Sequence, residues 1–167
     1  MNSKAKGGSF ERSVCKALSL WITDARRDDC LWRSAMSGGR ATVQLKKGQK
    51  ALAQCGDISA ITPEGHRLTD KWVIECKHVR DLNLRGAISS GAGLLPVFWE
   101  KLDEEAVAHK RYPMLIAKQN NSAVLVFAIK EHFREVSDAG VRAELVLAPD
   151  WVSIFLFAEM VQGSFLG

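Results

Sequence analysis

Two short apolar segments, at residues 53–61 and 71–78, carry charged side chains in positions where a buried strand normally has none. The second segment is typical of a β-strand, in which successive side chains point to opposite faces, so Glu75 and Lys77 share one face. Asp57, in the first segment, would bring a second carboxylate to the same place. Half-burying such charges is costly unless they interact with a partner. The two segments therefore predict one site in which two carboxylates and an ammonium group meet.

The rest of the chain shows apolar periodicities that predict a single α/β domain, with a mixed sheet flanked by helices. We expect helices at 10–22, 97–111, 130–136 and 151–162, and strands at 31–36, 53–61, 71–78, 112–118, 123–129 and 144–147. The second and third strands should form an antiparallel hairpin, because Pro63-Glu64-Gly65 is typical of a turn. Ser9 is the expected N-cap of the first helix, and residues 1–8 are interpreted as a flexible basic arm. Residues 81–95 are expected to form a loop or a short helical turn, and 151–157 would suit a buried strand equally well.

The composition is that of a globular protein, with 167 residues, 47% apolar and 25% charged, and it indicates one domain. The net charge of +4 suits a polyanionic partner but is shared by many proteins without one. Cys15, Cys30, Cys55 and Cys76 include no Cys-x-x-Cys pair, and no secretory leader is apparent, so we expect reduced thiols in a cytoplasmic protein. The most apolar stretch, 151–161, is too short to span a bilayer, and we expect no membrane association.

The charged pair of strands has the residue types that phosphodiester hydrolysis requires. The carboxylates of Asp57 and Glu75 can bind Mg²⁺, with Mn²⁺ as a substitute, and the main-chain carbonyl of Cys76 would lie within reach of the same ion. Lys77 can orient the nucleophile and neutralise developing charge. A Glu-x-Lys sequence alone is usually a surface pair on a strand. The prediction rests on its combination with Asp57.

Residues 37–54 are poor in large apolar side chains and are interpreted as a basic loop. Such a loop is either simply solvated, or it neutralises DNA phosphates and makes binding depend on salt. The expected DNA-binding side chains of this loop and of the N-terminal arm are Lys4, Lys6, Arg40, Lys46, Lys47 and Lys50.

The order of three motifs, Gly7-Gly8-Ser9-Phe10-Glu11-Arg12, Gly56-Asp57-Ile58 and Ile74-Glu75-Cys76-Lys77, resembles the PD-(D/E)xK nuclease superfamily. Within it, the chain looks most like the small Holliday junction resolvases of the archaeal and phage type. The resemblance covers residues 7–78, and element order agrees more weakly to residue 128. It implies a restriction-endonuclease-like fold, DNA cleavage with Mg²⁺ and a symmetric dimer.

Carried over by position, the resemblance makes Asp57 and Glu75 direct metal ligands and Lys77 the catalytic lysine. Glu11, which alone is only a favourable charge at a helix start, would complete the metal shell, often through water. Further matches are Ser34 or Ser37, for a serine-glycine loop that contacts DNA, and Gln119, for a polar residue near the site. Two features depart from the family pattern: Gly56 replaces a proline, and the segment beyond Leu145 has no counterpart.

We therefore expect a Mg²⁺-dependent endonuclease that cuts four-way DNA junctions as a homodimer, in the cytoplasm at the nucleoid, whether its origin is a cell or a phage. Paired nicks across a junction need two symmetry-related sites. The expected dimer interface is apolar surface on the 97–111 helix or on the 151–161 segment. The alternatives are a sequence- or damage-directed endonuclease and a non-catalytic DNA-binding module. His78 is expected to be an ordinary residue at a strand end.

Overall fold

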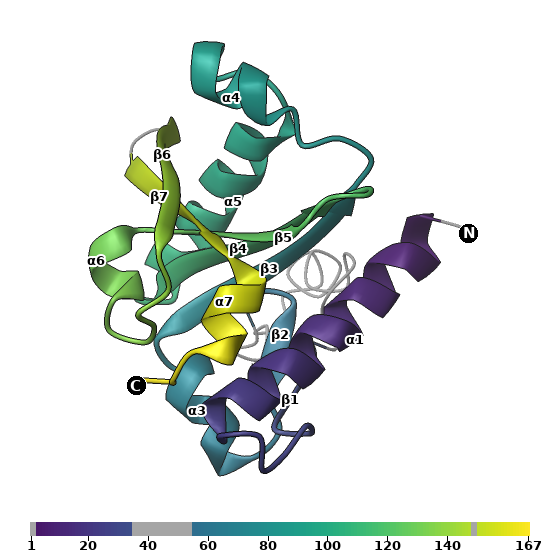
Figure 1. Ribbon diagram of the computed structural model, residues 1–167, viewed down its shortest axis with the longest axis vertical. Helices are drawn as coiled ribbons and strands as arrows, with labels where there is room; N and C mark the ends of the chain where they lie inside the picture. The colour runs from purple at the N-terminus through teal and green to yellow at the C-terminus, as the bar shows by residue number, and fades with distance from the viewer. Residues whose placement is uncertain (1–2, 35–54, 148–149) are drawn as a thin grey trace, which may run out of the picture.

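A five-stranded mixed sheet forms the centre of the molecule (Figure 1), and the computed structural model describes residues 3–34, 55–147 and 150–167. The elements in chain order are α1 (Ser3–Ile22), β1 (Leu31–Arg33), β2 (Ile58–Ala60), α3 (Pro63–Thr69), β3 (Trp72–Val79), α4 (Leu84–Ser90), α5 (Leu94–Ala108), β4 (Tyr112–Gln119), β5 (Val124–Ala128), α6 (Lys130–Phe133), β6 (Val141–Leu147), β7 (Asp150–Leu156) and α7 (Phe157–Gln162). The strand order in the large sheet is β3-β4-β5-β7-β6. This is the single-domain α/β class, with a mixed sheet flanked by helices, that the sequence predicts.

The strands β3 and β4 run parallel and are joined by a crossover that contains α4 and α5, whereas the other neighbouring strands are antiparallel. Parallel strands are normally covered on both faces and therefore read as continuous apolar runs. Met114, Leu115, Ile116 and Ala117 of β4 show this pattern, since all four are fully buried.

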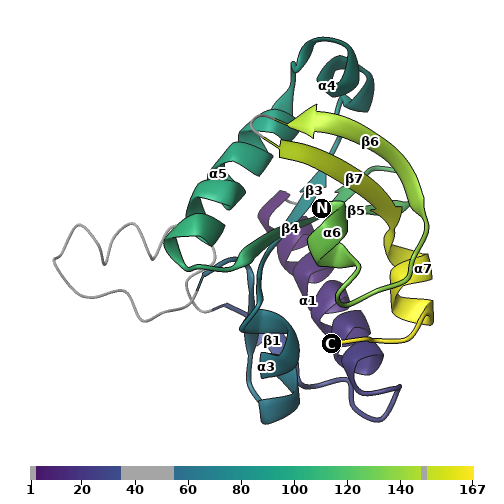
Figure 2. The same cartoon turned by 90° about the vertical axis from the view of Figure 1, so that its left-hand side faces the viewer.

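Helices cover both faces of the sheet, with α1 on one side and α5 on the other (Figures 1 and 2). On the first face, Ile74 of β3 packs in a cluster with α1, α6 and α7 that includes the stacked rings of Phe133 and Phe155, 3.9 Å apart. On the second face, Val73 packs with Trp99 of α5. Because the side chains of β3 alternate between these two cores, the register of this strand is fixed by packing.

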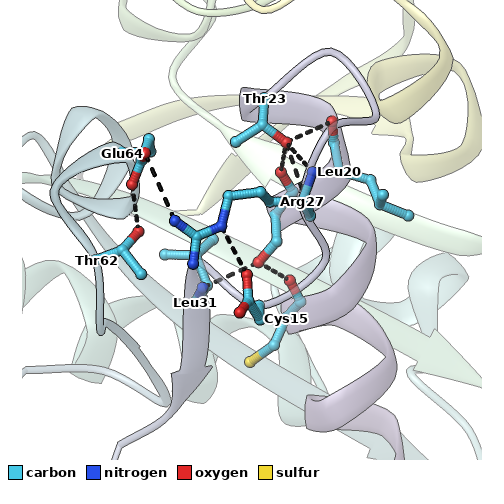
Figure 3. Close-up of polar contacts among 9 residues, drawn as sticks. Cys15, Leu20, Thr23, Arg27, Leu31, Thr62 and Glu64 are labelled. Atoms are coloured by element: carbon cyan, nitrogen blue, oxygen red, sulfur yellow. Dashed lines mark hydrogen bonds and ion pairs between the residues drawn. The ribbon is translucent and has the colours of Figure 1, made fainter.

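A second sheet contains only β1 and β2, which are antiparallel, and polar contacts connect it to its neighbours (Figure 3). The hydroxyl of Ser19 in α1 accepts the backbone N–H of Leu31 at 2.9 Å. The hydroxyl of Thr23 accepts the N–H of Arg27 at 3.0 Å, and the Arg27 guanidinium lies 3.7 Å from the Glu64 carboxylate of α3. These contacts hold β1 between α1 and α3, which places the end of β1 beside the segment that contains Asp57.

The predicted hairpin between the second and third strands is wrong. The strand β2 pairs with β1 and β3 pairs with β4, and α3 occupies the segment that was expected to be a turn. Pro63 and Glu64 are also favourable in the first turn of a helix, so the same residues that end a strand can begin a helix. Gly65 then allows α3 to approach the backbone closely, because a Cβ there would lie 2.5 Å from the carbonyl oxygen of Cys30.

The flexible arm expected at residues 1–8 is also wrong for the residues that the structure describes, because α1 already begins at Ser3. Ser9 is therefore inside the helix and is not its N-cap, and Glu11 lies well beyond the first turn. Two consecutive glycines, Gly7 and Gly8, lower helix propensity by about 1 kcal/mol each relative to alanine. Packing of the following turns against the sheet outweighs this cost.

The final helix predicted at 151–162 is wrong in its first half, where the alternative of a buried strand is confirmed as β7. This strand lies between β5 and β6, and Val152 and Phe155 are fully buried. The segment therefore belongs to the core and does not provide the exposed dimer surface that was expected of it. The helix α5 does retain exposed apolar side chains, including Val97 and Val107.

The other expected elements are confirmed, with small shifts at their ends, as β1, β4, β5, α6, β6 and α5, and the 81–95 segment contains the short helix α4. The basic loop expected at 37–54 lies outside the described residues. Of the helices that the structure describes, none combines the length and the apolar character needed to cross a membrane.

Candidate active site

The turn that precedes β2 places Asp57 against the edge of β3 that pairs with no other strand of the described residues. Gly56 has a φ of +69°, a left-handed conformation that proline cannot adopt, so this turn excludes the proline of the superfamily motif. The Asp57 N–H donates to the Ile74 carbonyl at 2.8 Å, and Asp57 Oδ2 accepts the Cys76 N–H at 2.9 Å. The Asp57 carbonyl accepts the Ser34 N–H at 2.8 Å. Both the backbone and the carboxylate of Asp57 are therefore fixed, and the residue is only 8% exposed.

Glu75 and Lys77 lie two residues apart on β3 and form an ion pair, as their shared face predicts. Their side chains are 17% and 29% exposed, and the Lys77 ammonium also lies 5.6 Å from the centre of the Phe98 ring of α5. Burial lowers the pKa of Lys77, but the charge of Glu75 and its hydrogen bond outweigh burial and leave the pKa raised. Lys77 therefore carries a positive charge over the working pH range.

Asp57 and Glu75 form a pair of neighbouring carboxylates. Burial, followed by the negative charge of Glu75, raises the pKa of Asp57 to about 6, although the Cys76 N–H and the Lys77 charge act in the opposite direction. Two carboxylates with one ammonium group and one amide between them leave a deficit of positive charge. Such a site has a strong preference for a cation.

Glu11 on α1 pairs with Arg33 at the end of β1, a residue that sequence reasoning did not select. Glu11 is largely buried, with 13% of its side chain exposed. Burial, the charge of Glu11 and, more weakly, that of Asp57 raise the pKa of the Cys15 thiol to about 12. Arg33 is followed by Ser34, whose N–H donates to the Asp57 carbonyl at 2.8 Å. The structure therefore brings Glu11 to the same region as Asp57, although its direct partner is an arginine.

The donor chemistry of this site fits a hard divalent cation. Among the residues that the structure describes, no three His, Cys, Asp or Glu side chains are grouped closely enough to hold a metal ion by themselves. Asp57 and Glu75 supply carboxylate oxygens, and the carbonyl of Cys76 points to the same strand edge as its N–H, which donates to Asp57. Two carboxylates and one carbonyl, with remaining positions for water and phosphate, match the way in which proteins bind Mg²⁺. The Cys76 thiol is buried, and burial raises its pKa well above its usual value, so the carbonyl and not the thiol is the group of Cys76 that would suit such an ion.

The other predicted site residues have varied positions. Ser34 adjoins Asp57, and its hydroxyl is 2.5 Å from that of Ser59. Gln119 accepts the Leu82 N–H at 3.0 Å, which fixes the chain after β3, and its role in the site remains a prediction. Lys4 and Lys6 lie in α1. Four predicted DNA-binding residues of the loop and the alternative serine lie outside the described residues: Arg40, Lys46, Lys47, Lys50 and Ser37.

Sequence reasoning missed two residues of α5 and its C-terminal end that support the Asp57 turn. Glu105 accepts the Gly56 N–H at 3.0 Å, and Arg111 donates to the Cys55 sulfur at 3.1 Å. Glu105 is part of an ordinary acidic run on an amphipathic helix, and nothing local distinguishes it from its neighbours. Its function depends on a contact between residues that are 49 positions apart.

Comparisons with known proteins identify a family that matches this chain. Residues 2–146 match the family described as "Phage putative PDDEXK endonuclease". Among solved structures, the chain is similar to Hjc, a Holliday junction resolvase from the archaeal hyperthermophile Archaeoglobus fulgidus, with 17% identity, 96% of each chain covered and a TM-score of 0.38. The search of curated proteins found no match. Because the family match spans most of the chain, the protein belongs to this phage PDDEXK endonuclease family and is a nuclease that acts on DNA.

Proposed function

We propose that this nuclease hydrolyses DNA phosphodiesters with Mg²⁺ as its cofactor, held by Asp57, Glu75 and the carbonyl of Cys76. The observation that carries the proposal is the hydrogen bond from the Cys76 N–H to Asp57 at 2.9 Å. This bond turns one carboxylate from the small sheet towards a second carboxylate on β3, so that two negative charges meet in a largely buried place. A binding module without catalysis would have no use for this arrangement, which costs stability when no cation is present.

Each residue has a role that follows from its position. When bound, the cation would polarise the phosphodiester and help to activate water for attack. Lys77 remains protonated beside Glu75, from where its ammonium can orient the attacking water or neutralise charge that develops on the phosphate. Glu11 would complete the metal shell through water, and Arg33 fixes its carboxylate. The Asp57 backbone bonds to Ile74 and Ser34 keep the first carboxylate in register with the second.

For the substrate, we propose a four-way DNA junction that is cut by a homodimer. The order of the Glu11, Asp57 and Glu75-Cys76-Lys77 motifs resembles that of small junction resolvases. A junction must be nicked on two strands, and a two-fold dimer presents two equivalent sites for this. The exposed apolar side chains Val97 and Val107 of α5 are the candidate interface that the described residues offer.

The test uses four-way junction, linear duplex of the same sequence and single-stranded DNA, each with Mg²⁺, with Mn²⁺ and with EDTA. The variants are Asp57→Asn and Glu75→Gln, with Glu131→Gln as a matched control, because Glu131 is an exposed carboxylate on α6. We expect junction cleavage with either metal, none with EDTA, and a loss of at least about 100-fold in the two site variants. Light scattering coupled to size exclusion measures the oligomeric state of the same samples.

The outcomes separate the parts of the proposal. Cleavage that persists in EDTA, or in both site variants, would refute the proposal that Asp57 and Glu75 hold a catalytic metal ion. Equal cleavage of junction and linear duplex would leave a nuclease that is directed by sequence or by damage. A monomer that cuts junctions with paired nicks would overturn the dimer.

A further inference from the structure

A small group of basic and polar side chains lies at the far end of β3 and β4, beyond the candidate active site. Lys6 of α1 donates a hydrogen bond to the side-chain oxygen of Asn120, in the turn after β4. One helical turn later, the ring of Phe10 packs against His78 of β3, with centroids 5.4 Å apart. His78 is paired in register with Lys118 of β4. We refer to Lys6, His78, Lys118 and Asn120 as the basic cluster.

The members of the basic cluster share one face of the sheet. The side chain of His78 lies on the α1 face, and paired residues of parallel strands point to the same side, so Lys118 lies there as well. Burial lowers the pKa of His78 and the charges of Lys6 and Lys118 lower it further, whereas a hydrogen bond with Asn120 raises it. Lys6 donates to the same Asn120, which follows Lys118 by two residues, so the four residues meet at this end of the sheet. Within the described part of the chain, neither lysine forms an ion pair.

Two partly exposed ammonium groups at one end of the sheet, with no carboxylate partner among the described residues, stay hydrated unless an anion binds beside them. The two lysines and the Asn120 amide supply hydrogen-bond donors, whereas the His78 ring is already hydrogen-bonded to Asn120. This is the set of donors that proteins use to contact DNA backbone phosphates. No base edge needs to be read for such contacts.

We propose that the basic cluster binds a backbone phosphate of the same DNA strand that is cut, or of the duplex arm that continues from it. The inference rests on the nuclease function proposed above. His78 follows Glu75 by three residues, about 10 Å along the strand, and the alternation of side chains places the two on opposite faces of β3. DNA that contacts both the basic cluster and the two carboxylates must therefore cross from one face of β3 to the other, next to the strand edge that Asp57 contacts. The cluster thus sets the direction in which DNA leaves the active site.

The test measures the salt dependence of DNA binding in the full chain with Asp57→Asn, which removes cleavage. Fluorescence anisotropy with labelled junction and duplex is recorded from 0.05 to 0.3 M salt for this parent and for the added pair Lys6→Gln and Lys118→Gln. Glutamine removes the charge and keeps a donor for Asn120. The matched control is Lys71→Gln with Lys110→Gln, two exposed lysines at the opposite ends of β3 and β4. A third pair, Lys6→Arg with Lys118→Arg, keeps the charge.

We expect the cluster pair to lower the slope of log K against log salt by about 1.8, because each lost phosphate contact contributes about 0.9. Curves that converge at 1 M salt then differ by about 60-fold in affinity at 0.1 M. The control pair and the arginine pair should match the parent.

Each other outcome counts against the proposal. If binding by the parent depends steeply on salt and the cluster pair has the same slope, the proposed phosphate contact is wrong. The proposed nuclease function would be unaffected by this result. Equal losses in the cluster and control pairs would show diffuse attraction by net charge and would also overturn the proposed phosphate contact. A parent that binds no DNA would overturn the cluster and the proposed function together, and the cleavage test would then fail as well.

Discussion

Asp57 allows the electrostatics of the site to be tested without any substrate. Its carboxyl group is buried beside Glu75, and the two effects raise its pKa from 3.8 to about 6. In the unfolded chain, the same group has its ordinary pKa near 3.9. Folding without a metal ion therefore forces a carboxylate into a place that disfavours its charge, and the cost depends on pH.

The direction of the effect follows from proton linkage. Below about pH 4, the group is protonated in both states and folding costs nothing extra. As pH rises from about 4 to about 6, the unfolded chain loses its proton before the folded chain, so stability falls, and the loss is complete above the folded pKa of about 6. At about 1.4 kcal/mol per pH unit, the total loss is about 3 kcal/mol.

The variant Asp57→Asn removes the charge and keeps an oxygen that can accept the Cys76 N–H. In EDTA, we expect it to be more stable than the wild type by about 3 kcal/mol at pH 7.5 and equally stable at pH 4. For a chain of this size, the gap at pH 7.5 corresponds to a rise in Tm of roughly 6–12 °C. Urea unfolding at pH 4, 5, 6 and 7.5 measures the free energy of unfolding directly. The same variant should have lost cleavage.

Two controls frame this prediction. Glu131→Gln should change the free energy of unfolding by less than about 0.5 kcal/mol at every pH, because Glu131 is exposed. Adding Mg²⁺ at pH 7.5 should stabilise the wild type and leave Asp57→Asn unchanged. A gap that is the same at pH 4 and pH 7.5, or an asparagine variant less stable than the wild type at pH 7.5, would refute the reasoning.

Three further predictions concern residues that support the Asp57 turn and the small sheet beside it. Gly56→Ala should destabilise the protein by about 2–4 kcal/mol in urea unfolding and abolish cleavage, because φ is +69° and the new Cβ would lie 2.6 Å from the Ile74 carbonyl oxygen. Glu105→Ala leaves the Gly56 N–H without its acceptor and should cost about 1–2 kcal/mol and lower the cleavage rate, whereas Glu105→Gln should restore most of both. Ser19→Ala removes the acceptor of the buried Leu31 N–H and should cost about 1–3 kcal/mol in the same unfolding assay.

Each of these three predictions has a matched control variant. Gly140→Ala should be nearly neutral, because, apart from its two chain neighbours, no heavy atom of the described residues lies within 4 Å of the new Cβ. A Glu105→Gln protein as weak as Glu105→Ala would show that the charge matters and not the hydrogen bond. Ser13→Ala is the control for Ser19, since the Ser13 hydroxyl donates to a carbonyl in its own helix, that of Phe10 at 2.7 Å. If both serine variants lose the same stability, the buried Leu31 amide is not the cause.

Local patterns predict the part of the site that β3 carries. The alternation of side chains along a strand is enough to put Glu75 and Lys77 on one face, and the structure pairs them. The apolar run of β4 and the turn after it are similarly local. These features depend on neighbours within a few residues, so they can be predicted from the amino-acid sequence alone.

The errors arise where the outcome depends on contacts between distant segments. Pro63-Glu64-Gly65 suits a turn and a helix start equally, and the choice is made by packing of Gly65 against the Cys30 backbone. The partners of Glu11 and Gly56, which are Arg33 and Glu105, are far away in sequence. Asp57 lies beside Glu75 even though their segments form no hairpin. Two hydrogen bonds, from the Asp57 N–H to Ile74 and from the Cys76 N–H to Asp57, hold it there in place of regular strand pairing.

The position of β3 at the end of the described sheet order has a consequence for solubility. An uncovered edge of an eight-residue, mostly apolar strand is a template for pairing with other chains and for aggregation. The Asp57 turn occupies the Ile74 carbonyl and the Cys76 N–H on this edge. The residues that prepare the site for a cation thus also shield the strand, so substitutions that loosen this turn should produce protein that is both inactive and prone to aggregate.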